Sequence, residues 1–187
     1  MFDRTVRCDL LWAPGLSETV DVSQRWILTA MERYGSELVT MLWRILGNEQ
    51  DVCDAYQTTF LQLAHRDDRR QPRHIKAYLF RTASNAAITM LRRRVVESRT
   101  LSEMEIRAQH AESTEPDFDA RRLTERLRHL IAELPDHLRS VIALRDLGEL
   151  PYEEVARTLQ ISTGTARVYR CKAVQLLAAW MNREEQP

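Results

Sequence analysis

The sequence predicts an all-α protein built from two small helical domains that a flexible acidic linker joins. Only five of its 187 residues are glycine, and alternating runs of β-branched residues, which are typical of strands, are almost absent. Apolar residues instead recur three and four positions apart, which is the spacing of a buried helix face. We expect an irregular leader over 1–22, a helical domain over 23–96, the linker over 97–117 and a second helical domain over 118–183.

We expect the first domain to begin with helices that are interrupted or ended by glycine residues. One apolar stripe runs from Trp26 to Tyr34, Gly35 interrupts it, and a second stripe runs from Leu38 to Leu46 until Gly47 ends the helix. Asn48 is placed to cap the next helix. The outward side of that helix is polar and holds Asp51, Asp54, Gln57 and Thr58. A polar helix surface serves solubility in most proteins, and it can equally bind a partner.

A basic segment follows from His65 to Arg99, with ten Arg and Lys against three acids, a net +7. Its polar loop ends at Pro72, and a helix is expected over about 73–95. The outward side of this helix is predicted to hold Lys76, Phe80, Arg81, Ser84, Asn85, Ile88, Arg92, Arg93 and Arg94. Aromatic rings, an amide and cations on one helix suit unpaired bases and a phosphate backbone. For Tyr78 and Phe80, burial in the core stays open as an alternative.

The formal net charge of the whole chain is +0, so it does not reveal the basic segment. Residues 102–119 hold six acids against Arg107, a net −5, and they have no usable apolar face. Local charge sets the field that a polyanion meets, so a nucleic-acid partner remains compatible with a neutral chain.

Three apolar helical stripes in the second domain predict a helix-turn-helix. They fall within 138–142, 152–159 and 166–180, and only Gln160, Ile161 and Ser162 separate the second from the third. The Ser162 hydroxyl is placed to cap the third helix. Three short helices of this kind must share one core.

The exposed side of that third helix indicates a DNA-binding surface. Arg167, Val168, Cys171 and Lys172 share the outward side, with Thr165 near its beginning and Arg170 at its edge. Between 161 and 183 there are four basic residues and no acidic one. Such a helix can enter a major groove while its cations contact phosphates. The alternative is the solvated surface of an ordinary helical hairpin.

Several classes of protein and site are disfavoured. The three cysteines, Cys8, Cys53 and Cys171, are far apart, which favours free thiols in a reducing cytoplasm. The histidines are scattered, so we expect no metal site and no cofactor. No catalytic residues are predicted, because no nucleophile has a base nearby and no glycine loop suits phosphate. No apolar run is long enough for a secretion signal or membrane insertion.

These motifs resemble those of bacterial RNA polymerase sigma factors of the extracytoplasmic-function class, which keep only regions two and four. The motifs similar to region four are Leu134-Pro135, Leu144-Arg145, Tyr152 to Ala156, Leu159, Ile161-Ser162 and Gly164-Thr165. Those similar to region two are Asp54, Gln57 and Phe60, then Ala77, Leu79, Arg81, Ala83, Asn85 and Leu91 to Arg94. The resemblance covers about Ser23 to Trp180 apart from the linker.

The resemblance implies a division of labour between the two regions. Region four would recognise the minus-35 promoter element as duplex and contact the flap of the polymerase β subunit. The residues implied for the minus-35 element are Ser162, Thr165, Arg167, Val168, Arg170, Cys171 and Lys172. Region two would bind the β′ clamp helices and the unpaired strand of the minus-10 element. The clamp residues implied are Asp51, Asp54, Gln57 and Thr58, and those for the minus-10 strand are Arg69, Arg70, Arg73, His74, Lys76, Phe80, Arg81, Asn85, Arg92 and Arg93.

The same resemblance implies that the protein acts in the cytoplasm, binds core RNA polymerase and promoter DNA, and has a cognate anti-sigma factor. It implies that the protein contributes binding energy and catalyses no reaction itself, since the polymerase core performs the chemistry. Two other interpretations stay open. A helix-turn-helix repressor or activator would bind duplex operator without polymerase, and a helical interaction protein would bind no DNA.

The sequence departs from the usual family pattern at several positions. Thr58 stands where an acid is usual, Val168-Tyr169 where Ser-Arg is usual, and Arg170 where an aliphatic core residue is common. We expect Tyr169 to have taken over the core position. Gln160 replaces a frequent glycine, at a cost on the order of 1 kcal/mol if it is left-handed. Pro151 replaces a capping serine, which the fold tolerates because proline can open a helix.

Overall fold

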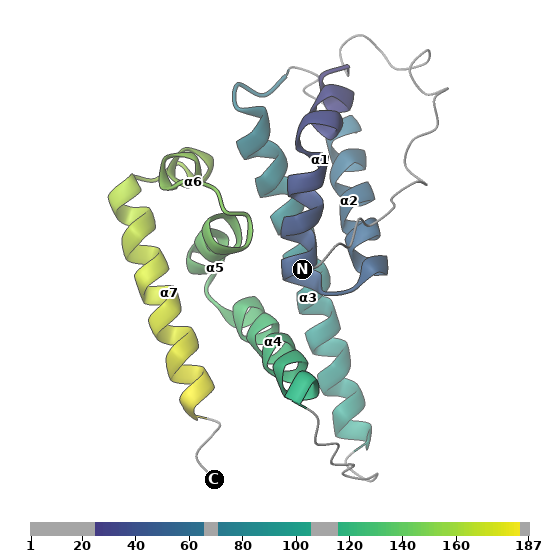
Figure 1. Cartoon of the computed structure of the whole chain (residues 1–187), viewed down its shortest axis with the longest axis vertical. Helices are drawn as coiled ribbons and strands as arrows, with labels where there is room; N and C mark the ends of the chain where they lie inside the picture. Colours follow the sequence, from purple (N-terminus) through teal and green to yellow (C-terminus); the bar gives the residue numbers. More distant parts are fainter. Residues whose placement is uncertain (1–24, 66–70, 106–115, 184–187) are drawn as a thin grey trace.

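The computed structural model describes residues 25–65, 71–105 and 116–183, of which 98–105 and 116–119 are described by their backbone alone. Within these ranges the chain is helical and contains no strand (Figure 1). The first unit comprises α1 (Arg25–Leu46), α2 (Glu49–Ala64) and α3 (Ile75–Glu105). The second comprises α4 (Pro116–Glu133), α5 (Asp136–Ile142), the π-helical turn η3 (Ala143–Leu147), α6 (Tyr152–Leu159) and α7 (Thr163–Arg183). The all-α prediction with two helical domains is confirmed; the predicted leader lies outside the described residues.

One predicted helix break is wrong, because α1 runs without interruption through Gly35. A Cβ built on Gly35 would lie 3.0 Å from the hydroxyl oxygen of Tyr56. The glycine therefore allows α2 to approach α1 closely and does not end the helix. Gly47 does end it, in the left-handed conformation at φ 75°.

The helix α3 is longer than predicted, since it continues to Glu105 and takes in the first part of the predicted linker. Residues 96–105 contain neither proline nor glycine, and Arg93 bonds to Glu97 one turn later at 2.8 Å. A segment rich in polar residues can thus continue an established helix. Residues 106–115 of the predicted linker lie outside the described residues.

The predicted caps are confirmed. The backbone N–H of Asp51 donates to the Asn48 side chain at 2.9 Å, and that of Thr165 donates to the Ser162 hydroxyl at 2.9 Å. Gln160 is left-handed at φ 58°, and its N–H donates to the carbonyl of Ala156. The short α6–turn–α7 geometry of a helix-turn-helix follows from these interactions.

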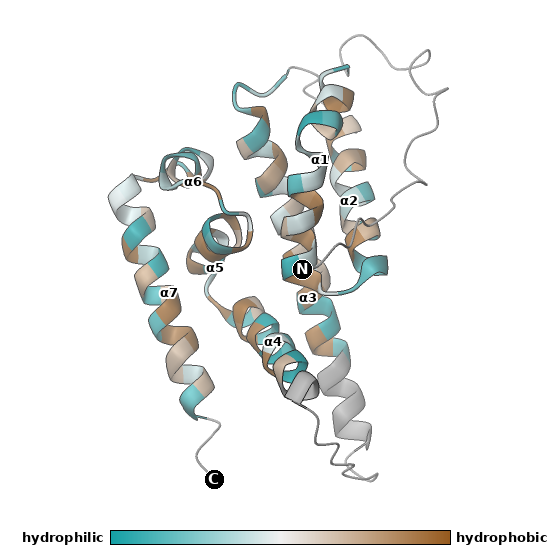
Figure 2. Cartoon of the chain, in the orientation of Figure 1, coloured by the Kyte–Doolittle hydropathy of each residue, from teal (hydrophilic) through white to brown (hydrophobic). Residues whose placement is uncertain are grey.

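Each unit has an apolar interior at helical spacing. In the first unit, α1, α2 and α3 pack mutually around Leu38, Leu42, Ile45, Val52, Ala55, Leu79 and Ala83. In the second, α4, α5 and α7 share a smaller cluster of Leu130, Ile131, Leu134, Leu138, Ile142, Ala173 and Leu177. Figure 2 shows hydrophobic and hydrophilic residues interspersed along α4 and α7.

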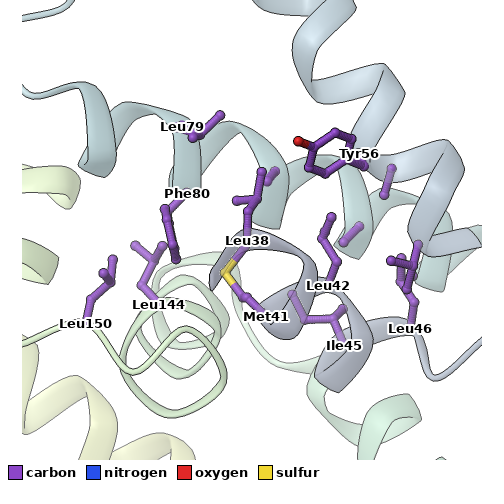
Figure 3. Close-up of a cluster of buried hydrophobic side chains, with 14 of the residues drawn as sticks. Leu38, Met41, Leu42, Ile45, Leu46, Tyr56, Leu79, Phe80, Leu144 and Leu150 are labelled. Atoms are coloured by element: carbon purple, nitrogen blue, oxygen red, sulfur yellow. The ribbon is translucent and has the colours of Figure 1, made fainter. Parts of the chain in front are cut away.

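The two units are packed directly against each other. Met41 of α1 and Phe80 of α3 belong to the same buried cluster as Leu144 and Leu150 of the second unit. Figure 3 shows Phe80 pointing toward Leu144, with Met41 beside it. In Figure 1, α5 and α6 lie between α3 and the outer helix α7. Apolar burial of this kind stabilises the contact between units as it does within a domain.

This packing corrects one sequence prediction. Phe80, Ser84 and Ile88 were expected on an outward side of α3, but their exposed fractions are 0%, 2% and 6%. The second unit covers this side of the helix. For Phe80 the alternative that it belongs to the core is confirmed.

Candidate nucleic-acid interface

The outer side of α7 presents a compact basic and apolar surface. Arg167, Cys171 and Lys172 are exposed, and Val168 is 51% exposed, although it is a large apolar side chain. The sequence places these four residues on the outward side, and the structure agrees. The opposite side buries Ala166, Ala173 and Leu177, which fixes the rotation of the helix about its axis.

The first turn of α7 is organised by its cap. The Ser162 hydroxyl lies 2.8 Å from that of Thr165 while it accepts the Thr165 N–H. Tyr169 is half-buried and meets the His137 ring edge-on, with the ring centroids 4.8 Å apart. This agrees with the expectation that Tyr169 fills a core position.

Arg170 points away from the outer surface of α7. Its guanidinium binds both carboxylate oxygens of Asp146 in η3, with N–O distances of 2.7 to 3.0 Å. The hydrogen bonds and the charge of Asp146 raise the pKa of Arg170 above its ordinary value. The structure therefore separates Arg170 from the other predicted minus-35 residues and makes it a link within the second unit.

Several predicted minus-10 residues lie on the exposed side of the first unit. Arg73, His74, Asn85 and Arg93 are exposed. Lys76 is half-buried, forms a 2.8 Å ion pair with Glu37 and lies over the Phe80 and Tyr34 rings at 5.6 and 5.8 Å. Its charge thus already has partners within the protein. Arg69 and Arg70 lie outside the described residues.

Two other predicted minus-10 residues reach across to the second unit. Arg81 donates to the carbonyl oxygen of Thr158 in α6 at 3.0 Å. Arg92 donates to the carbonyl oxygen of Ala132 in α4 at 3.2 Å and pairs with Asp136 at 3.1 Å. Both guanidinium groups are therefore engaged between the units.

The carboxylate of Asp136 has a second partner. Arg139 bonds to it and also donates to the carbonyl oxygens of Ala132 and Leu134 at 2.7 and 2.9 Å. The positive charge of Arg139, and then that of Arg92, lowers the pKa of Asp136 below its usual value. Asp136 is therefore ionised at neutral pH and joins α3 to the beginning of α5.

The four residues predicted for polymerase binding on α2 differ in their exposure. Asp54 and Gln57 are exposed, and Thr58 is half-buried. Asp51 accepts from the Asn48 amide at 2.9 Å and also pairs with Arg94, so its carboxylate helps to hold the beginning of α2. Sequence reasoning missed Leu61, which lies one turn beyond Gln57 and is 57% exposed. The sequence spacing could have indicated that Leu61 is exposed, because this residue falls outside the buried stripe of α2.

Both units match models of known families. Residues 30–96 match the model described as sigma-70 region 2, and residues 124–177 match sigma-70 region 4. The ECF RNA polymerase sigma-E factor of Salmonella typhimurium is 30% identical over 156 residues, covering 75% of this chain and 79% of the relative. The chain belongs to the ECF sigma factors. The general role of this family is promoter recognition by RNA polymerase.

Other relatives agree with this membership. The ECF sigma factor SigM of Bacillus subtilis is 28% identical over 152 residues, covering 81% of this sigma factor and 93% of SigM. SigE of Mycolicibacterium smegmatis is 29% identical over 140 residues, covering 73% of the chain and 54% of SigE, so the chain spans about half of that relative.

A solved structure shares the fold of this sigma factor. The structure of CnrH in complex with the cytosolic domain of CnrY matches with a TM-score of 0.54 at 22% identity, covering 87% of this chain and 91% of CnrH. At this identity the likeness shows the fold alone.

The described part of this sigma factor offers neither a metal site nor a membrane span. No group of three or more His, Cys, Asp or Glu side chains there could hold a metal ion. None of the described helices combines the length and apolar character needed to cross a membrane. Cys53 and Cys171 form no disulfide; Cys8 lies outside the described residues.

Gln175 is a further residue that sequence reasoning did not single out. It is exposed one turn beyond Cys171 and Lys172, on the same outer side of α7. Amide side chains bind adenine edges in the major groove. Its spacing from Cys171 could have indicated this position from the sequence.

Proposed function

We propose that this sigma factor directs RNA polymerase to promoters by dividing recognition between its two units. The second unit binds the minus-35 element as duplex through the outer side of α7. The first unit binds core polymerase through α2 and the unpaired minus-10 strand through α3 and the loop before it. The single observation that carries this proposal is the exposed side of α7, which presents Arg167 and Lys172 without an acidic neighbour on that helix.

The surface of α7 supports contact with duplex DNA. Arg167 and Lys172 can neutralise phosphates, and each such contact releases counterions. Val168 offers an apolar contact for a thymine methyl group. Arg167 also lies over the Tyr152 ring at 5.4 Å, which restricts its side chain before DNA arrives.

The exposed residues of the first unit support the other two contacts. Asp54, Gln57 and Leu61 give α2 a polar surface with one apolar side chain, which suits the β′ clamp helices. Asn85 is exposed on α3 and can bind an extruded base through its amide. We also propose that region four contacts the β flap, that no bond in the DNA is made or broken, and that the protein acts in the cytoplasm beside the polymerase.

An anti-sigma factor is part of this proposal. CnrH, which shares the fold, was solved with the cytosolic domain of another protein bound. A partner of that kind would regulate this sigma factor by covering its polymerase or promoter surfaces.

Run-off transcription with purified core polymerase on a genomic fragment library tests the proposal. We expect transcripts from a defined set of start sites that share upstream and downstream elements. Core polymerase alone is the control. If the sigma factor binds duplex DNA but produces no specific start sites, the repressor or activator interpretation replaces this one.

A further inference from the structure

The ring of Tyr152, at the beginning of α6, has two arginine side chains over it. The Cζ atom of Arg145, in η3, lies 4.9 Å from the ring centroid, and that of Arg167, in α7, lies 5.4 Å from it. Both distances are within the range in which a guanidinium is attracted to the face of an aromatic ring. One tyrosine therefore connects η3 with the exposed side of α7.

The tyrosine itself is held in place by the second unit. Tyr152 is half-buried. Arg145, over its ring, also donates to the carbonyl oxygen of Leu150 at 3.2 Å. Asp146 raises the pKa of Arg170 most, and Tyr152 raises it further through a hydrogen bond. The ring is thus fixed by groups that do not face the DNA.

Arg167 differs from Arg170 in what its guanidinium contacts. Arg167 is exposed, and within the described ranges its guanidinium forms neither a hydrogen bond nor an ion pair; its partner is the ring of Tyr152. A side chain that is restricted before binding loses less entropy when it binds. A bidentate contact with a base edge demands one orientation of the guanidinium plane, whereas counterion release at a phosphate depends on charge.

We propose that Tyr152 is a positioning residue, which holds the guanidinium of Arg167 ready to contact a base of the upstream element. Tyr152 acts through the arginine and needs no contact with the bases. The inference rests on the proposed function for the identity of the DNA, whereas the stacking of Arg167 on Tyr152 concerns the free chain.

NMR of the free protein tests the stacking without DNA. Protons over the face of an aromatic ring shift upfield, so the Nε–H cross-peak of Arg167 reports on the ring. This cross-peak is identified by its loss in Arg167→Lys. We expect Tyr152→Phe to leave it near its parent position and Tyr152→Leu to move it downfield. A cross-peak that stays in place in Tyr152→Leu would overturn the stacking.

Two duplex probes test the consequence for DNA. The first is selected from a random-sequence library by the protein, with and without core polymerase, and the second is the same duplex with its sequence scrambled. Fluorescence anisotropy measures the affinity of each variant for both probes. Circular dichroism verifies that the helices persist, and Tyr152→Met takes the place of Tyr152→Leu if the latter loses helical content.

We expect Tyr152→Leu to lower the affinity for the selected duplex about threefold to fivefold and to change that for the scrambled duplex less than about twofold. Tyr152→Phe, which keeps the ring, should match the parent. In the Arg167→Ala background, Tyr152→Leu should have no further effect, because the guanidinium that the ring holds on α7 is absent.

Tyr169→Leu is the matched control. Tyr169 is another half-buried tyrosine of the same unit, and its ring meets that of His137. Any loss of affinity that it causes through packing should be the same with Arg167 and with alanine at that position.

Three results would overturn the positioning role. The first is an equal effect of Tyr152→Leu in both Arg167 backgrounds. The second is a loss in Tyr152→Phe as large as that in Tyr152→Leu, which would assign the effect to the hydroxyl. The third is an equal loss on both duplexes, which would exclude an oriented base contact. Run-off transcription reports separately: if it shows no specific start sites while the coupling persists, the proposed function fails and the positioning role stands.

Discussion

The guanidinium of Arg170 binds both carboxylate oxygens of Asp146, and so joins the recognition helix to the π-helical turn that precedes the helix-turn-helix. A planar fork facing a carboxylate fixes orientation as well as distance. Because Arg170 is occupied in this way, we infer that it sets the angle of α7, whereas Arg167 and Lys172 stay exposed for the proposed contact with DNA. The family pattern of an aliphatic residue at this position is replaced here by an ion pair.

Replacing Arg170 should therefore lower the stability of the protein, because the substitution removes a two-point contact with Asp146 as well as a charge. We expect Arg170→Ala and Asp146→Ala each to lower the free energy of unfolding by about 0.5–1 kcal/mol, a modest value because the side chains are 40% and 30% exposed. Urea denaturation of both single variants and the double variant measures their coupling. Strictly additive losses would show that the two residues do not interact in solution.

Arg167→Ala with Lys172→Ala should weaken minus-35 binding and leave polymerase binding intact, because both side chains project from the outer side of α7. If both contact phosphates, the plot of log affinity against log salt should flatten by about 2. Fluorescence anisotropy with a duplex probe measures this. Arg33→Ala with Arg183→Ala removes the same charge from other exposed positions and should leave the slope unchanged; equal flattening would indicate a non-specific charge effect.

Local features of the fold could be predicted from the sequence because neighbouring residues determine them. Asn48 and Ser162 cap helices through atoms three residues away, and Gly47 and Gln160 adopt left-handed conformations where the chain turns. The buried stripes of the helix-turn-helix likewise follow from helical spacing. These features do not depend on distant parts of the chain.

The contacts that the sequence could not predict join residues that lie far apart in the chain. The sequence predicts that Arg81 binds DNA from an outward side of its helix, but in the structure its guanidinium donates to Thr158, which lies 77 residues away. The sequence predicts a helix break at Gly35, whereas in the structure the glycine makes room for Tyr56, which lies on another helix. Helical periodicity distinguishes apolar from polar sides, but it does not reveal which polar side a second domain covers.

The surface of α2 allows a graded test of polymerase binding. We expect Asp54→Ala with Gln57→Ala to fold and to fail to co-purify with core polymerase, because both polar side chains are exposed and lie one turn apart on α2. Leu61→Ala should weaken binding roughly tenfold through lost apolar contact. Its exposed neighbour Gln62→Ala is the matched control. Unchanged affinity of the Asp54/Gln57 variant in surface plasmon resonance would remove this assignment.

Asn85→Ala should weaken open-complex formation more than duplex binding. The amide is exposed on α3 beside the buried contact between units, where an extruded base could bind it. Permanganate footprinting of unpaired thymines gives the first quantity, and anisotropy with a closed duplex gives the second. Equal effects on both would count against capture of a single strand.

The left-handed Gln160 allows the turn of the helix-turn-helix to be tested without touching DNA. At its φ of 58°, a residue with a Cβ loses on the order of 1 kcal/mol of stability, whereas glycine adopts this conformation without strain. Glycine also makes the unfolded chain more flexible, which offsets part of the stability gained by removing the strain. We expect Gln160→Gly to raise the free energy of unfolding by about 0.5 kcal/mol. Gln62→Gly, inside α2, should lower it by about 1 kcal/mol. Urea denaturation distinguishes the signs: if both variants are destabilised alike, the turn is not left-handed in solution, and the angle between α6 and α7 must arise from packing alone.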